Sequence, residues 1–280
     1  AGILANYTFD SFGNFEFQAI GAGLIHGTYL IEAGDLKFIL QEFNNGVFQY
    51  PDRISHNQRL VKSQGDGNLL PFQLPLPILN SDKKLEEVAA GKGALSKEDQ
   101  VVLDFYLGQK ELIEAYQKFQ AILPARLTHN DTKINNLIFS HDLQKVEALV
   151  DLDTLMSGYL MYDFGDLVRT VACSESETSQ NWGAIKLEIP VFEQLLKGYW
   201  EGIRSLATEE ETKSLLLAGE VMTCIMGLRF FADHLQGNVY YKVQYPEQNF
   251  HRAKNQMLLL QSLQANKSEL KEIWKSVTQS

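Results

Sequence analysis

The sequence predicts an α+β fold, in which a small antiparallel β-lobe precedes a larger and mainly helical lobe. Short runs of alternating polar and apolar residues, separated by glycine-rich turns, fill the first fifty residues, and patterns of helical period follow from residue 96 onward. With 280 residues, of which 45% are hydrophobic, the chain can bury a core in one large domain or two modest lobes. We therefore expect a β-lobe over residues 1–60, a connection over 61–95 and a helical lobe over 96–280.

The β-lobe is expected to be a meander of three short strands. Residues 14–20 alternate aromatic and polar side chains, and residues 28–31 and 36–43 are rich in β-branched and aromatic residues. Glycines separate the first two strands and an Ala-Gly-Asp turn separates the last two, so neighbouring strands should pair antiparallel. Prolines oppose a helix between residues 58 and 92, where we expect an extended connection.

The helical lobe is expected to begin at a capping box, in which Ser96 and Asp99 precede one long helix over about 97–121. Two short strands and then five further helices are predicted after it, the last of them amphipathic. The strands span 136–139 and 146–152, and the helices cover most of 163–173, 190–206, 209–235, 248–262 and the region of 270–277.

The charge and cysteine content exclude several classes of protein. Lysine and arginine number 25 against 35 aspartates and glutamates, a net charge of −10, so we expect no nucleic-acid or membrane partner. Cys173 and Cys224 lie in apolar runs and are expected to be buried free thiols, typical of a reducing compartment. The apolar stretch 215–231 contains Glu220 and Arg229, which favours a buried helix over a membrane span. Because the N-terminus lacks a signal-peptide pattern, we predict a cytoplasmic location.

One short segment carries the strongest chemical signal. His129-x-Asp131-x(4)-Asn136 has the spacing of a phosphotransferase catalytic loop. A loop carboxylate can reach the acceptor hydroxyl and take its proton, while an amide oxygen five residues later can ligate Mg²⁺ beside the transferred phosphate. Alone, the pattern is of moderate specificity, because three fixed positions in eight recur by chance.

A second segment supplies carboxylates for a metal. Twenty residues after Asp131, an apolar run ends in Asp151 and Asp153, and Mg²⁺ prefers such oxygen ligands. Each acid taken separately reads most simply as a solvated surface group or a helix cap. The ordered set of acids with an Asn and a His favours a magnesium site.

Three segments, residues 128–136, 149–154 and 162–169, together resemble the aminoglycoside phosphotransferase/choline kinase superfamily. Within it the resemblance is greatest to the N-acetylhexosamine 1-kinases. The resemblance implies a protein-kinase-like fold of two lobes, with ATP as co-substrate and Mg²⁺ as cofactor. It also implies phosphorylation of the anomeric hydroxyl of N-acetylglucosamine or N-acetylgalactosamine.

The resemblance assigns roles to individual residues of these segments. It implies that Asp131 is the catalytic base and that Asn136 and Asp151 are metal ligands, with Asp153 in water-mediated contact or holding the loop. His129 would bond the backbone near the metal-binding strand. Asp163 would support the catalytic loop, so the triplet Asp-Phe-Gly over 163–165 is not the metal-binding motif it imitates.

The nucleotide site is less clear from the sequence. The glycine-rich segment between the first two strands is expected to cover the phosphates, although a plain hairpin turn is about as probable from the pattern alone; its members are Gly21, Gly23 and Gly27. Gln41 stands where many phosphotransferases have a phosphate-binding lysine. Either Mg²⁺ carries more of the charge or a base such as Lys37, Arg53 or Lys62 substitutes. We recognise no hinge within 61–95.

The acceptor site implied by the resemblance lies in the second half of the chain. Arg229, Asp233 and Tyr240 match sugar-binding positions, and His26 is a weaker candidate. The simpler interpretation is a helix-end ion pair and an interface aromatic. The leading hypothesis is a sugar kinase; the alternatives are a kinase of choline, an amino alcohol or an aminoglycoside, and a nucleotide-binding pseudokinase. A metal-dependent phosphohydrolase is less consistent, because no second metal site is visible.

Overall fold

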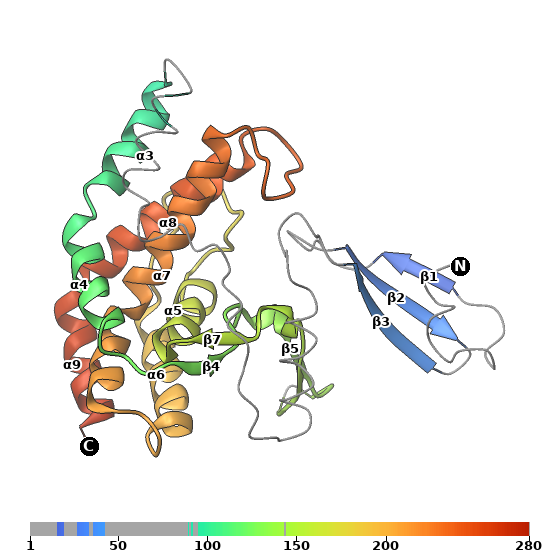
Figure 1. Cartoon of the computed structure of the whole chain (residues 1–280), viewed down its shortest axis with the longest axis horizontal. Helices are drawn as coiled ribbons and strands as arrows, with labels where there is room; N and C mark the ends of the chain where they lie inside the picture. Colours follow the sequence, from blue (N-terminus) through green and yellow to red (C-terminus); the bar gives the residue numbers. More distant parts are fainter. Residues whose placement is uncertain are drawn as a thin grey trace.

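The N-terminal part of the chain forms a small antiparallel sheet (blue in Figure 1). The computed structural model describes residues 16–19, 27–33, 36–42, 89, 91, 95–142 and 144–279. Strands β1 (Glu16–Ala19), β2 (Gly27–Ala33) and β3 (Leu36–Glu42) pair in the order β1-β2-β3. The predicted meander is therefore confirmed.

The first helix of the helical part is shorter than the sequence predicted. The capping box is present, because the Ser96 side chain accepts the Asp99 N–H at the start of α3 (Lys97–Leu107). The prediction of one helix to residue 121 is wrong, since the helix is interrupted at Gly108 and Gln109 before α4 (Lys110–Gln120) begins. Glycine has a low helix propensity, and here it ends α3 with its N–H donating to the Asp104 carbonyl.

Short strands follow and frame the segment that carries the motifs. Strand β5 (Leu137–Phe139) pairs antiparallel with β6 (Val146–Leu149), and β4 (Arg126–Thr128) pairs with β7 (Met156–Gly158). The β4–β7 pair was not predicted, because three-residue strands leave almost no pattern. Asn136 is not in a strand as predicted, but ends the 3₁₀ turn η2 (Ile134–Asn136); a second such turn is η3 (Leu152–Thr154). The predicted strand over 146–152 likewise ends at Leu149.

Five helices complete the described chain and hold its core. They are α5 (Leu160–Val171), α6 (Ile189–Ile203), α7 (Glu209–Leu235), α8 (Gln248–Ala265) and α9 (Lys267–Thr278). Helix α7 packs against both α5 and α8 (Figure 1). Large side chains with no exposed surface, such as Phe164, Phe230 and Phe231, fill these contacts. The helices predicted for this region are confirmed within a few residues.

Helix α7 is the one helix in the described ranges that is long and apolar enough to cross a membrane by length and composition. However, 67% of its apolar window is buried inside the protein, against α5 and α8. Its buried Glu220 lies 3.5 Å from Lys267 of α9. The helix is therefore the central core helix, as the sequence predicted. Both cysteines are free thiols, with Cys224 buried in α7 and Cys173 half-buried.

Candidate active site

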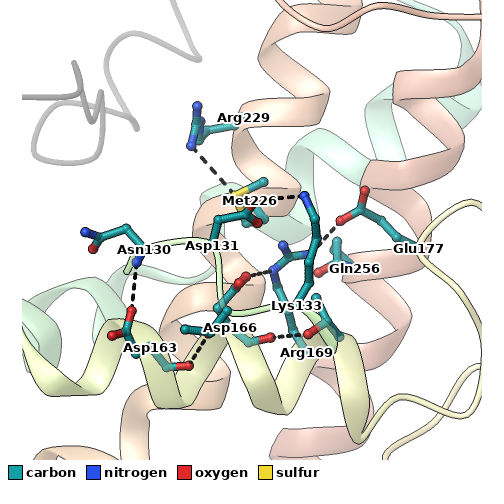
Figure 2. Close-up of polar contacts among 12 residues, drawn as sticks. Asn130, Asp131, Lys133, Asp163, Asp166, Arg169, Glu177, Met226, Arg229 and Gln256 are labelled. Atoms are coloured by element: carbon teal, nitrogen blue, oxygen red, sulfur yellow. Dashed lines mark hydrogen bonds and ion pairs between the residues drawn. The ribbon is translucent and has the colours of Figure 1, made fainter. Parts of the chain in front are cut away.

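Asp163, near the start of α5, fixes the loop between β4 and η2 through hydrogen bonds. Both oxygens of Asp163 accept backbone N–H groups, from His129 at 2.9 Å and from Asn130 at 2.8 Å. The Thr132 hydroxyl donates to the Asp163 carbonyl. Burial raises the pKa of Asp163 above its usual range, while the two N–H groups act to lower it. Asp163 thus holds the backbone directly before Asp131 (Figure 2).

The loop is also tied to the segment that follows β6. The His129 ring nitrogen Nε2 lies 3.1 Å from the Val150 carbonyl oxygen, directly before Asp151. The Thr154 hydroxyl donates to the His129 carbonyl at 2.6 Å. The sequence-predicted His129 therefore lies between the loop and the 150–154 segment, and Asp153 beside Thr154 is buried.

Two residues of this region have left-handed backbone angles that L-residues seldom adopt. Asn130 has φ 62° and Asp151 has φ 63°. The Asn130 side chain offsets the cost by donating to the carbonyls of Thr128 and Thr154. Such residues concentrate at functional sites, where the surrounding contacts enforce them. Here one of these residues directly precedes the predicted base Asp131, and the other is the predicted metal ligand Asp151.

Asp131 has one oxygen engaged by two donors of its own loop. Its Oδ2 accepts the Lys133 ammonium at 2.7 Å and the Asn136 side-chain N–H at 3.0 Å. Although burial acts to lower the pKa of Lys133, the carboxylates of Asp131, Asp151 and Asp166 raise it above its usual value. Lys133 was not among the site residues predicted from the sequence, although its position inside the motif was an available signal.

The arrangement of Asn136 suits a metal ligand. Its Nδ2 donates to the Asp131 backbone carbonyl at 2.7 Å and to Asp131 Oδ2, and within the described chain its Oδ1 accepts no hydrogen bond. The Val150 N–H donates to the Asn136 carbonyl, and β5 pairs with β6, so Asn136 and Asp151 lie at one end of the same hairpin. The described residues contain no cluster of three or more His, Cys, Asp or Glu side chains able to hold a metal ion. A donor set of one amide and one or two carboxylates fits Mg²⁺, which is usually held by few protein groups together with phosphates and water.

Arg229 and Tyr240, which the sequence placed in the acceptor site, lie together. Arg229 Nη2 donates to the Tyr240 hydroxyl at 3.2 Å, and its guanidinium lies over the rings of Tyr240 and Tyr241 at 5.4 and 5.6 Å from their centres. Its other nitrogen contact is the Met226 sulfur at 3.8 Å (Figure 2). Within the described chain this half-buried cation has no carboxylate partner.

Asp233 has a structural role that the sequence did not predict. Its carboxylate is buried and accepts the N–H groups of Tyr240 and Tyr241 and the side chain of Asn249, at 2.7 to 2.9 Å. With both oxygens bonded to the chain, Asp233 anchors the loop after α7 and supports the two tyrosines. Its contact with the acceptor stays a prediction.

Most of the residues that the sequence predicts to bind the nucleotide, or to replace the missing lysine, are outside the part of the chain that the structure describes. Gly21 and Gly23 fall outside the described residues, as do the acceptor candidate His26, the bases Arg53 and Lys62, and most of the predicted connection over 61–95. Gly27 begins β2, and Gln41 lies in β3 opposite Thr28. Their roles stay predictions.

Comparison with known proteins agrees with the motifs. Residues 82–195 match the phosphotransferase enzyme family, a segment that includes the catalytic loop, the β5–β6 hairpin and α5. Choline kinase from Cryptosporidium parvum Iowa II superposes with a TM-score of 0.55 at 13% identity, over 97% of this chain and 95% of the kinase. A spectinomycin phosphotransferase, determined with ADP and spectinomycin, superposes with a TM-score of 0.56 at 9% identity, over 96% and 97% of the two chains.

At these identities the likeness shows the fold, which is the protein-kinase-like α+β fold of the two phosphotransferases. The family match covers the segment in which the structure joins Asp131, Asn136 and Asp163 by hydrogen bonds through one loop. The family match is thus limited to residues 82–195, and the likeness to the two solved phosphotransferases extends over nearly the whole chain as a likeness of fold.

Proposed function

We propose that this protein is a small-molecule kinase that transfers the γ-phosphate of ATP to a sugar hydroxyl, most consistently the anomeric hydroxyl of an N-acetylhexosamine. The observation that carries the proposal is the geometry of Asp131. One of its oxygens is fixed by Lys133 and Asn136, while Oδ1 makes no hydrogen bond within the described chain and can accept the proton of the acceptor hydroxyl. ATP would bind between two lobes, under the segment of Gly21, Gly23 and Gly27 and beside Gln41 of β3, while His26 is a weaker candidate for the acceptor site.

The proposed metal is Mg²⁺, held by Asn136 Oδ1 and the carboxylate of Asp151, with Asp153 as a further or water-mediated ligand. When bound, Mg²⁺ would neutralise charge on the phosphates of ATP. The protein's own contribution is to position groups: Asp163 and His129 fix the loop backbone, and Asn136 fixes Asp131 by a hydrogen bond of 3.0 Å.

The surroundings of Arg229 favour a neutral, oxygen-rich acceptor over a cationic one. A quaternary ammonium group binds best against free aromatic faces or carboxylates. In this chain the Arg229 guanidinium lies over the faces of Tyr240 and Tyr241, and Asp233 is used by the backbone. A guanidinium that has no carboxylate partner within the described residues instead suits hydroxyl or carbonyl oxygens, such as those of an N-acetylated sugar.

An acceptor panel tests the proposal. With Mg·ATP, we expect ADP release to rise on addition of N-acetylglucosamine or N-acetylgalactosamine, and to stay at background with choline, ethanolamine or an aminoglycoside. Turnover with the cationic acceptors alone would contradict the sugar assignment. Absence of turnover with every acceptor, despite binding of Mg·ATP in calorimetry, would favour the pseudokinase alternative.

Lys133 is proposed to supply the positive charge that Gln41 lacks at the phosphates. It bonds Asp131, the proposed base, and lies within electrostatic range of Asp151, the proposed metal ligand. Lys133→Gln is expected to lower kcat by about 10²-fold, the usual effect of removing one group that stabilises transition-state charge. Lys197→Gln, in an exposed pair with Glu193, is the matched control and should leave kcat unchanged. Equal kcat values in both variants would contradict the role.

A further inference from the structure

A buried cluster of charged side chains lies beside the proposed base. None of its members was among the site residues predicted from the sequence. Asp166 and Arg169 are one turn apart on α5, and Glu177 follows in the segment between α5 and α6. Arg169 Nε donates to Asp166 at 2.7 Å, and its Nη1 donates to Glu177. Arg252 of α8 lies 4.0 Å from the other oxygen of Glu177. The side chains of Asp166, Arg169 and Arg252 are 5% exposed or less.

The guanidinium of Arg169 is held by two carboxylates and still has a nitrogen to spare. A planar guanidinium bound through Nε and Nη1 cannot rotate, so the direction of Nη2 is fixed. Within the described chain, Nη2 makes no hydrogen bond or ion pair. Asp166 Oδ2 and Gln256 Oε1 are also buried without hydrogen-bond partners there. A polar cluster with several unused groups is costly unless something else bonds to it.

The electrostatic surroundings of Arg169 include the proposed base and one predicted acceptor residue. Although burial acts to lower the pKa of Arg169, the charges of Asp166, Glu177 and Asp131 raise it above its usual value. Burial and the charge of Arg169 act to lower the pKa of Arg229, but Tyr241 and Tyr240 raise it above its usual value. Arg169 therefore lies within electrostatic range of both Asp131 and Arg229. Figure 2 shows Arg169 extending from α5 toward the loop of Asp131 and Lys133.

We propose that Arg169 is a binding residue of the acceptor site, whose Nη2 donates a hydrogen bond to one oxygen of the acceptor, and that Asp166 and Glu177 are its positioning residues. The inference rests on the proposed function, because it needs an acceptor bound beside Asp131. Arg169 and Arg229 would then recognise oxygens from α5 and α7 respectively, while Asp131 holds the reacting hydroxyl. An acceptor with several oxygens fits this pair of arginines better than one with a single hydroxyl.

The contact can be read from deoxy analogues of the accepted sugar. In the wild-type protein, loss of the oxygen that Arg169 binds should raise KM for the acceptor by about tenfold to a hundredfold, the range for a hydrogen bond from a charged donor. In Arg169→Lys, KM for the parent sugar should rise by a similar factor. In this variant, removal of the same oxygen from the sugar should not raise KM for the acceptor any further, while KM for ATP stays within twofold of wild type.

A milder variant guards against loss of folding in Arg169→Lys. Glu177→Gln keeps an oxygen for Arg169 Nη1 and is expected to raise KM for the acceptor severalfold, with the KM of ATP and the melting temperature unchanged. Glu193→Gln, in an exposed pair on α6, is the matched control. If every deoxy analogue costs the same factor in wild type and both variants, Arg169 does not contact the acceptor, although the kinase assignment stands. Absence of turnover in the wild type would contradict both proposals.

Discussion

Replacement of Asp131 by asparagine is expected to lower kcat for phosphoryl transfer by about 10²–10⁴-fold, the usual contribution of a positioned general base. Asparagine has nearly the same shape, so the loop should keep its geometry: Asp163 holds the backbone before residue 131, and Asn136 bonds the residue 131 carbonyl. What is lost is a carboxylate able to align the acceptor hydroxyl and take its proton. Single-turnover measurement of ADP formation at saturating acceptor gives the effect directly.

Measuring nucleotide binding distinguishes loss of the catalytic base from disruption of the whole site. Calorimetry with Mg·ADP should give wild-type affinity for Asp131→Asn, because the proposed metal ligands Asn136 and Asp151 are intact. Asp104→Asn, at an exposed carboxylate of α3 that bonds only Gln100, is the matched control and should keep full activity. Retention of full activity in Asp131→Asn would overturn the assignment of the base.

The parts of the fold that were predictable depend on short-range patterns. The capping box of Ser96 and Asp99 and the long apolar run within α7 are visible in continuous stretches of sequence, so the ends of these elements could be given closely. The break at Gly108 was missed because a single glycine is tolerated in many helices, and here the contacts of α4 with α7 decide where the chain turns. Propensity alone does not distinguish these cases.

The same contrast applies to the site. Asp131, Asn136 and Asp151 could be named because their chemistry fixes a spacing along the chain. The Arg169–Glu177 pair could not be named, because its proposed role depends on groups that are near it in space but distant in sequence. These are Asp131 from the loop and Arg252 from α8. For Asp233 the sequence likewise could not show that its carboxylate accepts backbone N–H groups of the next loop.

Gly165 is expected to be a packing residue, so that Gly165→Ala destabilises the fold more strongly than any surface change. The triplet Asp-Phe-Gly over 163–165 lies within α5, and Gly165 faces α7. A Cβ at this position would overlap the Ala218 carbonyl oxygen and come within 2.6 Å of Met222 Cγ. Because the obstacle includes backbone of the central helix, the two helices must move apart. Overpacking of this kind costs about 1–3 kcal/mol, and the disturbance would reach Asp163 two residues away.

A second glycine gives the control that isolates packing from helix propensity. Gly198 lies inside α6, and an added Cβ there would meet nothing within 4 Å. Gly198→Ala should therefore stabilise the protein by about 0.5–1 kcal/mol, because alanine loses less backbone entropy than glycine in a helix. Melting temperatures of the two variants should move in opposite directions from wild type. If Gly165→Ala raised the melting temperature as Gly198→Ala does, α5 could not be packed against α7 as closely as described, and the support of Asp163 beneath the catalytic loop would lose its basis.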